Sequence, residues 1–265
     1  MNKEAGVVTG LVELTAISPI DGRYRKKVEE LAPYASEMAL IKTRVEVEAR
    51  YLVALSEVGV VRPLGEEEKE KLLALGPNLS FEQAERVKEI EDKIHHDVKA
   101  MERAFREFLA GTSLEDVVEM IHFALTSEDI NNLSYRIMLD RARKEICVPA
   151  LGLVIDAFAE RAREYKGIVM LARTHGQPAV PTTLGKEMAN FAYRLNRQVR
   201  KIEDVRLTGK LNGAVGNYSA HVLASPEVDW ISFSQKFVRS LGFEPYLFTT
   251  QINPYDDMIE LFQAF

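Results

Sequence analysis

Apolar residues recur at steps of three or four along most of this chain, which predicts a protein built of α-helices. The most regular stripe consists of Leu184, Met188, Phe191, Leu195, Val199 and Ile202. Charged residues lie on the opposite side of this stripe, and Gly209 follows its end. We therefore expect a long amphipathic helix over about 182–208. Strand-like patterns are few and short, so the sequence predicts an all-α fold class.

Several other stripes predict further helices. One covers about 40–55 and stops at Gly59, and a short charged helix is expected over 66–75. The stripe over 81–108 is nearly thirty residues long, so we expect a break near its middle. Additional helices are expected over 114–125, from 130 to Gly167 with Pro149 at an opening or a kink, from Ser225 to Gly242, and from Asn253 onward.

Length and charge restrict the class of protein. The 265 residues suffice for an N-terminal helical domain over 1–112 and a second helical domain over 113–265. The net charge of -6 argues against nucleic acid as a partner, because a phosphate-backbone binder normally carries a basic face. No apolar run suits a signal peptide or a membrane span. The single cysteine, Cys147, fits a reducing cytoplasm.

The segment 173–181 presents one histidine, His175, which is followed by a glycine and two prolines. Pro178 and Pro181 forbid a continuing helix, and the segment is predicted to be a stiff loop, suited to neither helix nor strand. Because histidine exchanges protons near neutral pH, His175 is a candidate acid or base. Taken alone, a loop histidine is more often structurally ordinary.

A second histidine segment, His95-His96-Asp97, lies within the stripe over 81–108. Both histidines point away from the apolar face that Ile94 and Val98 continue. Adjacent helical positions diverge by about 100°, so the pair is poorly placed to chelate a metal, and we predict no metal site. The segment is either a ligand-binding face or a solvated surface.

Two further segments suit an anionic ligand. Thr126 and Ser127 stand where two helical stripes meet, and a helix N-terminus with two hydroxyls would bind a carboxylate, although a plain helix cap explains them equally well. Arg23-Tyr24 follows a turn and would hold a phosphate or carboxylate, although an exposed arginine is the more common explanation. The glycine turn 213–216 lacks the lysine and hydroxyl of a phosphate loop.

Several strings of residues together form a specific pattern. They are Ser18-Pro19-Ile20-Asp21-Gly22-Arg23-Tyr24, His96-Asp97-Val98-Lys99-Ala100, His122-Phe123-Ala124, Thr126-Ser127-Glu128-Asp129-Ile130-Asn131-Asn132, Thr174-His175-Gly176-Gln177-Pro178-Ala179, Gly185-Lys186-Glu187-Met188-Ala189-Asn190 and Asn212-Gly213-Ala214-Val215-Gly216-Asn217-Tyr218. These strings resemble the adenylosuccinate lyases of the bacterial purine pathway, a family of the fumarase and aspartase superfamily, and they follow that family's order. The similarity extends from about Leu14 to the end of the chain.

The resemblance implies a fold, a reaction and roles for residues. It implies a helical bundle and β-elimination of fumarate, from adenylosuccinate to give AMP and from the succinylcarboxamide ribotide of the same pathway, without a cofactor. His175 matches the general acid. The implied substrate contacts are Arg23, Tyr24, His95, His96, Asp97, Thr126, Ser127 and Gln251. The superfamily also implies a homotetramer whose sites draw on several subunits, which would make the 184–202 stripe an interface as well as core.

One element of the family pattern is missing. The family's base is a serine in a Ser-Ser-x-Met-Pro-x-Lys-x-Asn-Pro loop, and no such string occurs in these 265 residues. The apolar face of the last helix continues to Phe265, so we expect a truncated bundle and an inactive fragment. Two alternatives remain. Another fumarate-releasing lyase, such as argininosuccinate lyase, is disfavoured by Arg23-Tyr24, while a non-catalytic helical scaffold or regulatory protein would bind without turnover.

Overall fold

The computed structural model describes residues 14–265, and these are mostly helical, as the sequence predicted. The α-helices are α1 (Arg25–Val28), α2 (Ala32–Ala35), α3 (Glu37–Glu57), α4 (Glu66–Asn78), α5 (Phe81–Ile94), α6 (Asp97–Leu109), α7 (Ser127–Ala142), α8 (Val148–Glu164), α9 (Leu184–Asp204), α10 (Ser219–Ala224), α11 (Trp230–Ser240) and α12 (Asp256–Ala264). Short 3-10 turns, η1 (Glu29–Leu31) and η2 (Glu115–Met120), and one π-helical turn, η3 (Arg143–Cys147), join some of them.

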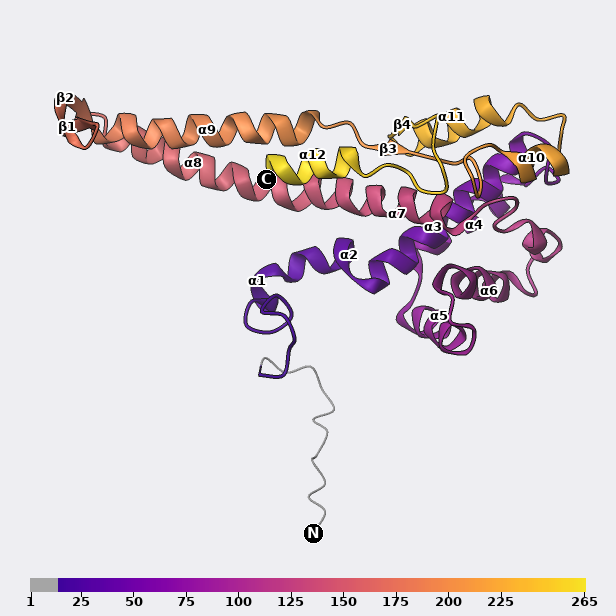
Figure 1. Cartoon of the computed structure of the whole chain (residues 1–265). Coiled ribbons are helices and arrows are strands. Elements are labelled where there is room, and N and C mark those ends of the chain that lie inside the picture. Colours follow the sequence, from indigo (N-terminus) through magenta and orange to yellow (C-terminus); the bar gives the residue numbers. More distant parts are fainter. Residues whose placement is uncertain (1–13) are drawn as a thin grey trace, which may run out of the picture.

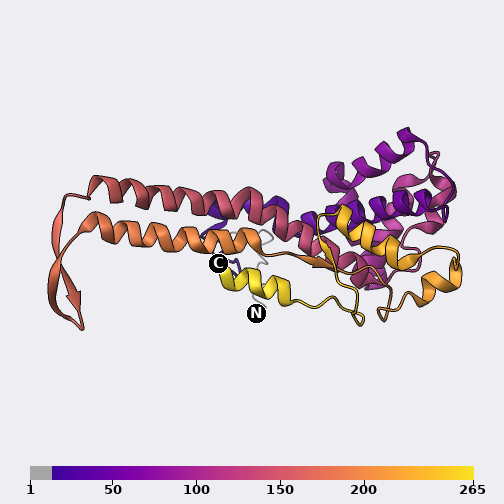
Figure 2. The same cartoon turned by 90° about the horizontal axis from the view of Figure 1, so that it is seen from above.

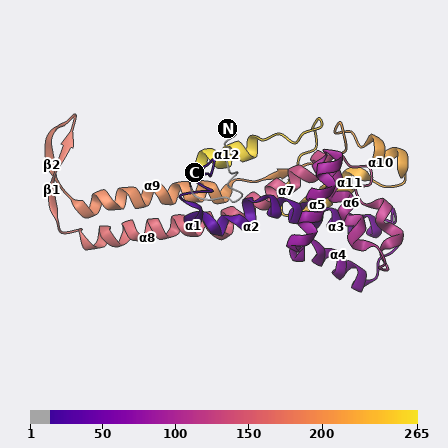
Figure 3. The same cartoon turned by 90° about the horizontal axis from the view of Figure 1, so that it is seen from below.

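The molecule consists of a compact end and a long arm. Figure 1 shows α3, α4, α5, α6, α10 and α11 gathered at one end, while α8 and α9 run side by side away from it. Figures 2 and 3 show the same arm from above and from below. The arm ends in a hairpin of β1 (Val169–Thr174) and β2 (Gln177–Thr183). A second, two-residue pairing joins β3 (Thr208–Gly209) to β4 (Glu244–Pro245) in parallel.

Helix α3 lies at the centre of the compact end. The Ser36 hydroxyl caps its start by accepting the Ala39 N–H at 3.2 Å, and the chain leaves the helix through Gly59, whose φ of +80° suits a glycine. Apolar side chains of α3, among them Val45 and Leu52, are fully buried. The core extends from Ile41 to Leu261, across the predicted domain boundary at residue 112, and that boundary stays a prediction.

The break predicted within the 81–108 stripe is confirmed. Helix α5 ends at Ile94, His95 adopts a left-handed conformation with φ +53°, and α6 begins at Asp97. His96 caps α6, because its Nδ1 accepts the Lys99 N–H at 3.2 Å. Both histidines are exposed, as the pattern indicated. The two apolar faces can therefore pack on the same core at an angle that a straight helix would not allow.

The arm starts as one long helical path. Helix α7 continues through η3 into α8, and Pro149 lies in the first turn of α8. Because proline has no N–H and crowds the preceding turn, the wider π-helical turn just before it accommodates the ring. From Ser127 to Glu164 this path is about 55 Å long at roughly 1.5 Å per residue. Helix α9 returns along it, as the stripe over 182–208 predicted.

The arm buries little of its apolar surface. Helix α8 has no buried residue, and Leu153 and Tyr193 are 73% and 66% exposed. The two helices still approach closely at one point, where a Cβ on Gly185 would lie 2.4 Å from the carbonyl oxygen of Ala162. Phe158 and Phe191 stack with their ring centroids 5.6 Å apart.

The prediction of a loop over 173–181 is wrong. These residues form most of the β1–β2 hairpin, with Arg173 opposite Pro178 and a bulge between Leu171 and Arg173. His175 and Gly176 make the two-residue turn with φ of +52° and +72°, the positive values that a tight hairpin requires. A two-stranded ribbon consists only of edge strands, which tolerate prolines because an edge N–H needs no ladder partner.

Two other helix predictions need correction. The segment 114–125 forms only η2 and then turns, because His122 and Ala124 take left-handed conformations with φ of +63° and +56°. The helix expected from Ser225 starts instead at Trp230, where the Asp229 side chain accepts the Ser232 N–H at 3.1 Å. The short α10 precedes it and was not predicted.

Helix α12 begins at Asp256, close to its predicted start, and Figure 1 shows it beside α9 at the base of the arm. Within residues 14–265 no helix is long and apolar enough to cross a membrane.

Candidate functional site

The start of α7 presents two free hydroxyl groups. Thr126 and Ser127 are partly buried, and neither hydroxyl makes a hydrogen bond within residues 14–265. Asp129 accepts the Thr126 N–H at 2.9 Å, which fixes the turn into the helix. The cap that sequence reasoning offered as the plain explanation is therefore present, but its side-chain acceptor is Asp129. Two unpaired hydroxyls remain at the positive end of a helix, an arrangement suited to a carboxylate ligand.

Asp129 also joins this helix start to the glycine turn 213–216. Its carboxylate accepts the Asn212 N–H at 3.0 Å and the Gly213 N–H at 3.2 Å, and it lies 3.2 Å from Lys210 Nζ. Asp129 and Lys210 are both fully buried. A buried pair of this kind needs further hydrogen bonds to offset desolvation, and Lys210 donates one to the Gly213 carbonyl at 2.7 Å.

The segment that carries Gln251 runs beside this turn. Asn212 Nδ2 donates to Thr249 Oγ1 at 2.8 Å, and Asn253 Nδ2 donates to the Thr208 carbonyl at 3.3 Å. A Cβ on Gly216 would lie 2.2 Å from the Thr249 carbonyl oxygen, so only glycine permits this approach. The structure therefore holds Gln251, which is exposed, on a segment anchored at both ends near the α7 start.

Burial raises the pKa of Glu128, which follows Ser127, although Lys210 and Arg136 oppose the increase. Its Oε1 accepts the Tyr255 hydroxyl at 3.5 Å. The start of α7 therefore carries a half-buried carboxyl group beside the two hydroxyls.

The His95–Asp97 segment is tied to the same helix by a buried arginine. Arg44 of α3 donates from Nη2 to Asp97 Oδ2 at 2.5 Å and from Nε to Asn131 Oδ1 at 2.9 Å. Because the Lys99 N–H occupies His96 Nδ1, His96 keeps its Nε2 for a ligand. Of the predicted residues, Thr126, Ser127, Gln251 and the His95–Asp97 segment thus occupy one region of the compact end.

A histidine in the turn before α7 has a buried acidic partner. His122 Nδ1 lies 2.5 Å from Glu48 Oε1, and Glu48 Oε2 accepts the His122 N–H at 3.1 Å. Glu48 is fully buried, while the imidazole remains 15% exposed. Burial alone would lower the pKa of His122, but the hydrogen bond and charge of Glu48 raise it above its ordinary value. This pairing places a histidine with a buried carboxylate partner four residues before Thr126.

The other predicted residues lie elsewhere in the chain. Arg23 and Tyr24 are exposed just before α1, with the guanidinium 5.5 Å from the phenol ring centroid. Tyr34 of α2 donates to Glu145 at 2.6 Å, which places this region beside the middle of the long helical path. His175 is exposed at the far tip of the arm (Figure 1). Within one chain, Arg23 and Tyr24 are therefore far from His175. Both groups are also far from Thr126.

The residues that sequence reasoning missed are mostly polar groups in the core. Arg44 and Glu48 belong to α3, and their one signal was that charged positions interrupt an otherwise apolar helix. His122 and Asp129 lay inside the strings quoted for the family resemblance, where they were not singled out.

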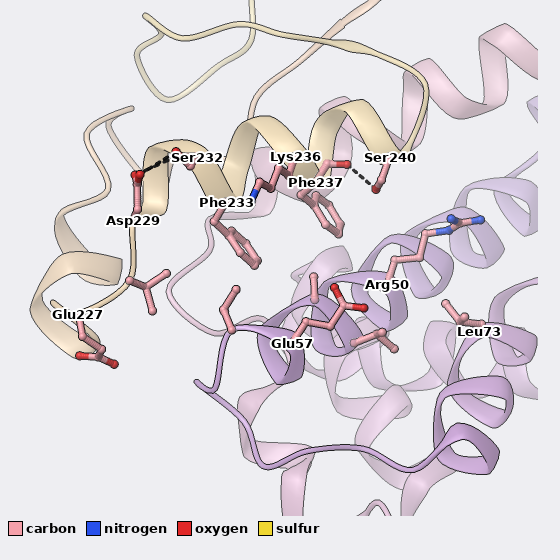
Figure 4. A pocket seen from close by; sticks show the side chains of 14 residues that line it. Arg50, Glu57, Leu73, Glu227, Asp229, Ser232, Phe233, Lys236, Phe237 and Ser240 are labelled. Carbon is pink, nitrogen blue, oxygen red and sulfur yellow. Dashed lines mark hydrogen bonds between the residues drawn. The ribbon is translucent and has the colours of Figure 1, made fainter.

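A hollow at the compact end is separate from all of these residues. It has a volume of about 890 Å³ and lies between α3, α4 and α11 (Figure 4). Apolar side chains, including Phe233 and Phe237, form its inner wall, and none of the predicted site residues lines it. No group of three or more potential metal ligands occurs within residues 14–265.

The family is decided by comparison with known proteins. A family model described as lyase matches residues 22–265. The chain belongs to this lyase family.

Individual relatives carry a more specific name. The adenylosuccinate lyases of Escherichia coli strain K12 and Haemophilus influenzae are 48% and 47% identical to this chain over 258 residues. These alignments cover 96% of this chain and 57% of each relative, so the chain spans little more than half of their length.

Solved structures confirm the fold. A β-carboxy-cis,cis-muconate cycloisomerase from Acinetobacter calcoaceticus and a fumarate lyase from a Mesorhizobium species each match this lyase-family chain with a TM-score of 0.71. The matches cover 89% and 90% of this chain and 53% of each structure, at 20% identity. The helical architecture predicted from the sequence is therefore similar to that of these two structures.

Proposed function

We propose that the protein acts as an adenylosuccinate lyase of purine nucleotide biosynthesis. It eliminates fumarate from adenylosuccinate to give AMP, and from the analogous succinylcarboxamide ribotide. The observation that carries this proposal is the similarity to adenylosuccinate lyases across 96% of the chain. No observation on the chain favours argininosuccinate lyase, the alternative considered from the sequence.

The candidate residues fit the steps of this elimination. A base removes a proton from the succinyl carbon beside a carboxylate, the electrons form the carbon–carbon double bond, and the carbon–nitrogen bond breaks. His175 protonates the departing nitrogen. Thr126 and Ser127 bind a succinyl carboxylate, because their hydroxyls are free at a helix N-terminus. Arg23 and Tyr24 bind the phosphate, while the His95–Asp97 segment and Gln251 position the remainder of the substrate.

This assignment requires more than one copy of the chain. The helical path from Ser127 to Glu164 is about 55 Å long, and His175 lies beyond its end. Arg23 and Tyr24 directly precede α1, and Tyr34 of the following α2 contacts Glu145 in the middle of the same path. A substrate cannot contact all three groups in one chain, so the site is formed where chains meet, as in the homotetramer that the resemblance implies. The exposed apolar side chains of α8 and α9 support such an interface.

The general base is a separate part of the proposal. The serine-containing string of the family does not occur in these 265 residues, and relatives are longer than this chain. We therefore propose that the 265-residue chain alone binds ligand weakly and does not catalyse elimination. A cytoplasmic location is supported by Cys147, which has no disulfide partner.

Fumarate release from adenylosuccinate, followed with the complete protein and with the 265-residue chain, tests this function. We expect turnover by the complete protein and none by the shorter chain. A complete protein that binds AMP but releases no fumarate would support the scaffold alternative and refute the lyase.

A further inference from the structure

We propose that Arg44 is a positioning residue that fixes the His95–Asp97 segment against the start of α7. This inference rests on the proposed function, because it concerns the placement of two of the proposed substrate-binding segments. Arg44 itself touches no ligand. It acts through Asp97 and Asn131, which belong to α6 and α7.

The guanidinium of Arg44 can fix both the distance and the relative orientation of Asp97 and Asn131. Its Nη2 donates to Asp97 Oδ2 at 2.5 Å, and its Nε donates to Asn131 Oδ1 at 2.9 Å. These two nitrogens belong to one rigid planar group, so the carboxylate and the amide cannot move independently. Since Asn131 is four residues after Ser127, one turn of helix separates this contact from the free hydroxyls.

Burial distinguishes Arg44 from a residue that binds substrate directly. Its side chain is only 2% exposed, whereas that of Asp97 is 45% exposed. The arginine therefore holds one carboxylate oxygen from inside, while Asp97 remains accessible from outside. Burial raises the pKa of Asp97, but the charge of Arg44 and the hydrogen bonds to the carboxylate outweigh this and hold the pKa below its ordinary range.

The core holds the residues just after this segment, because Val98 and Met101 are buried, but it does not hold the polar side chains of the segment itself. His95 is exposed and in a left-handed conformation, and the hydrogen bond of the His96 ring is to its own helix. Without Arg44, Asp97 would lose its contact to α3, and the polar side chains at the start of α6 would shift relative to Thr126. A ligand that contacts both sides would then lose its preorganised site.

A second arginine offers a matched control. Arg141 of α7 also joins α3 and α7, donating to both oxygens of Glu46 at 2.9 Å and 2.8 Å. It contacts none of the candidate site residues. Replacing Arg141 therefore removes a charged contact between the same two helices without releasing the His95–Asp97 segment.

The test compares Arg44→Met and Arg141→Met in the complete protein. Arg44→Met should lower kcat/KM for adenylosuccinate on the order of 10²-fold, as expected for a displacement of about 1 Å in a binding segment. Arg141→Met should lower it less than about 3-fold, since no site residue moves. Arg44→Lys keeps the charge but loses the planar guanidinium with its two donors, so its kcat/KM should lie between those of Arg44→Met and the wild type. It also provides a folded variant should Arg44→Met fail to fold.

A double-mutant cycle separates positioning from general stability. If Arg44 acts through Asp97, the kcat/KM loss of Arg44→Met combined with Asp97→Asn should be smaller than the product of the two single losses. Multiplicative losses, or equal losses for Arg44→Met and Arg141→Met, would overturn the proposal.

Hydrogen exchange tests the same inference without relying on activity. Arg44→Met should speed exchange of the Lys99 and Ala100 amides by about 10-fold, while amides of α11 remain unchanged. Unchanged exchange at Lys99 and Ala100 would overturn the positioning role. If wild-type protein releases no fumarate while these amides do respond, the lyase proposal fails, and Arg44 is still shown to fix the segment.

Discussion

The compact end and the arm of this molecule obtain their stability in different ways. In the compact end, side chains such as Val45, Leu52 and Phe105 have no solvent exposure. In the arm, α8 has no buried residue, and Leu153 is 73% exposed. The compact end therefore contains its own core, whereas the arm needs additional protein surface to cover its apolar side chains.

The candidate residues follow the same division. The free hydroxyls of Thr126 and Ser127 lie at the compact end, where Asp129 and Arg44 secure the neighbouring segments. His175 lies at the tip of the arm, in the turn that joins β1 to β2. We therefore expect the compact end to form the binding surface and the arm to present the proposed acid to a different copy of the chain.

The largest expected effect concerns the tip of the arm. Because a positioned general acid contributes on the order of 10² to 10⁴ in rate, His175→Gln should lower kcat of the complete protein by that factor. Substrate affinity should stay within a few-fold, and the oligomer should remain intact because the imidazole is exposed. Steady-state kinetics of fumarate release measure this change.

Mixing chains sharpens this prediction. His175→Gln chains and Ser127→Ala chains should each be impaired, but their mixed oligomers should regain activity, because some sites then combine a normal hairpin with a normal α7 start. No recovery after co-refolding would argue that His175 and Ser127 serve the same chain. Near-normal turnover of His175→Gln alone would remove His175 from its assigned role.

How much the sequence predicted also depends on the region. Apolar periodicity predicted the long helices of the arm and the break at His95, because these depend on local packing faces. It failed at η2, where Glu48, from a distant part of the chain, binds the His122 N–H and the backbone turns. It also failed at the hairpin, where the left-handed turn of His175 and Gly176 outweighs the two prolines.

The sequence predicted the separate segments of the candidate site. It did not predict how these segments are arranged in space. Residue strings indicated Thr126, Ser127 and His175, but nothing local to them reveals that about 55 Å of helix separates them. Likewise, the connection of Asp97 to α7 depends on Arg44, which looks like an ordinary helical arginine in the sequence. Tertiary contacts of this kind have no signature in spacing.

The next effect contrasts two phenylalanines in the 265-residue chain. Phe105→Ala should cost about 3–5 kcal/mol of unfolding free energy, because the ring is fully buried in the compact end and its removal leaves a cavity. Phe191→Ala, on the arm, should cost less than about 1 kcal/mol, since Phe191 is already 45% exposed. Urea titrations at low protein concentration measure both. Equal costs would refute the division between a self-contained end and a dependent arm.

A smaller effect is the loss of folding stability at acid pH. Burial lowers the pKa of His221 to about 4 from its ordinary 6.5, and its Nδ1 has no hydrogen-bond partner within residues 14–265. Between those values the unfolded chain binds a proton that the folded chain does not, so stability falls as pH falls from 6.5 to 4. This loss should amount to on the order of 3 kcal/mol.

His221→Phe isolates this contribution. The substitution keeps a ring beside Trp230, whose centroid lies 4.8 Å away, and removes the titrating group. The difference in unfolding free energy between pH 6.5 and 4 should therefore shrink in the variant, whatever its absolute stability. An unchanged pH dependence would show that other groups cause the acid sensitivity.

The smallest effect we predict concerns assembly through the arm. Leu153→Asp in the complete protein should weaken the oligomer, because burial of a leucine side chain contributes about 1.5–3 kcal/mol and the carboxylate would have to be desolvated as well. Phe81→Asp is the matched control, since Phe81 is 65% exposed at the start of α5 in the compact end. Sedimentation velocity should show smaller species for Leu153→Asp and an unchanged oligomer for Phe81→Asp. Dissociation by the control alone would place the interface on the compact end, and the arm would then lose its proposed role in bringing His175 to another chain.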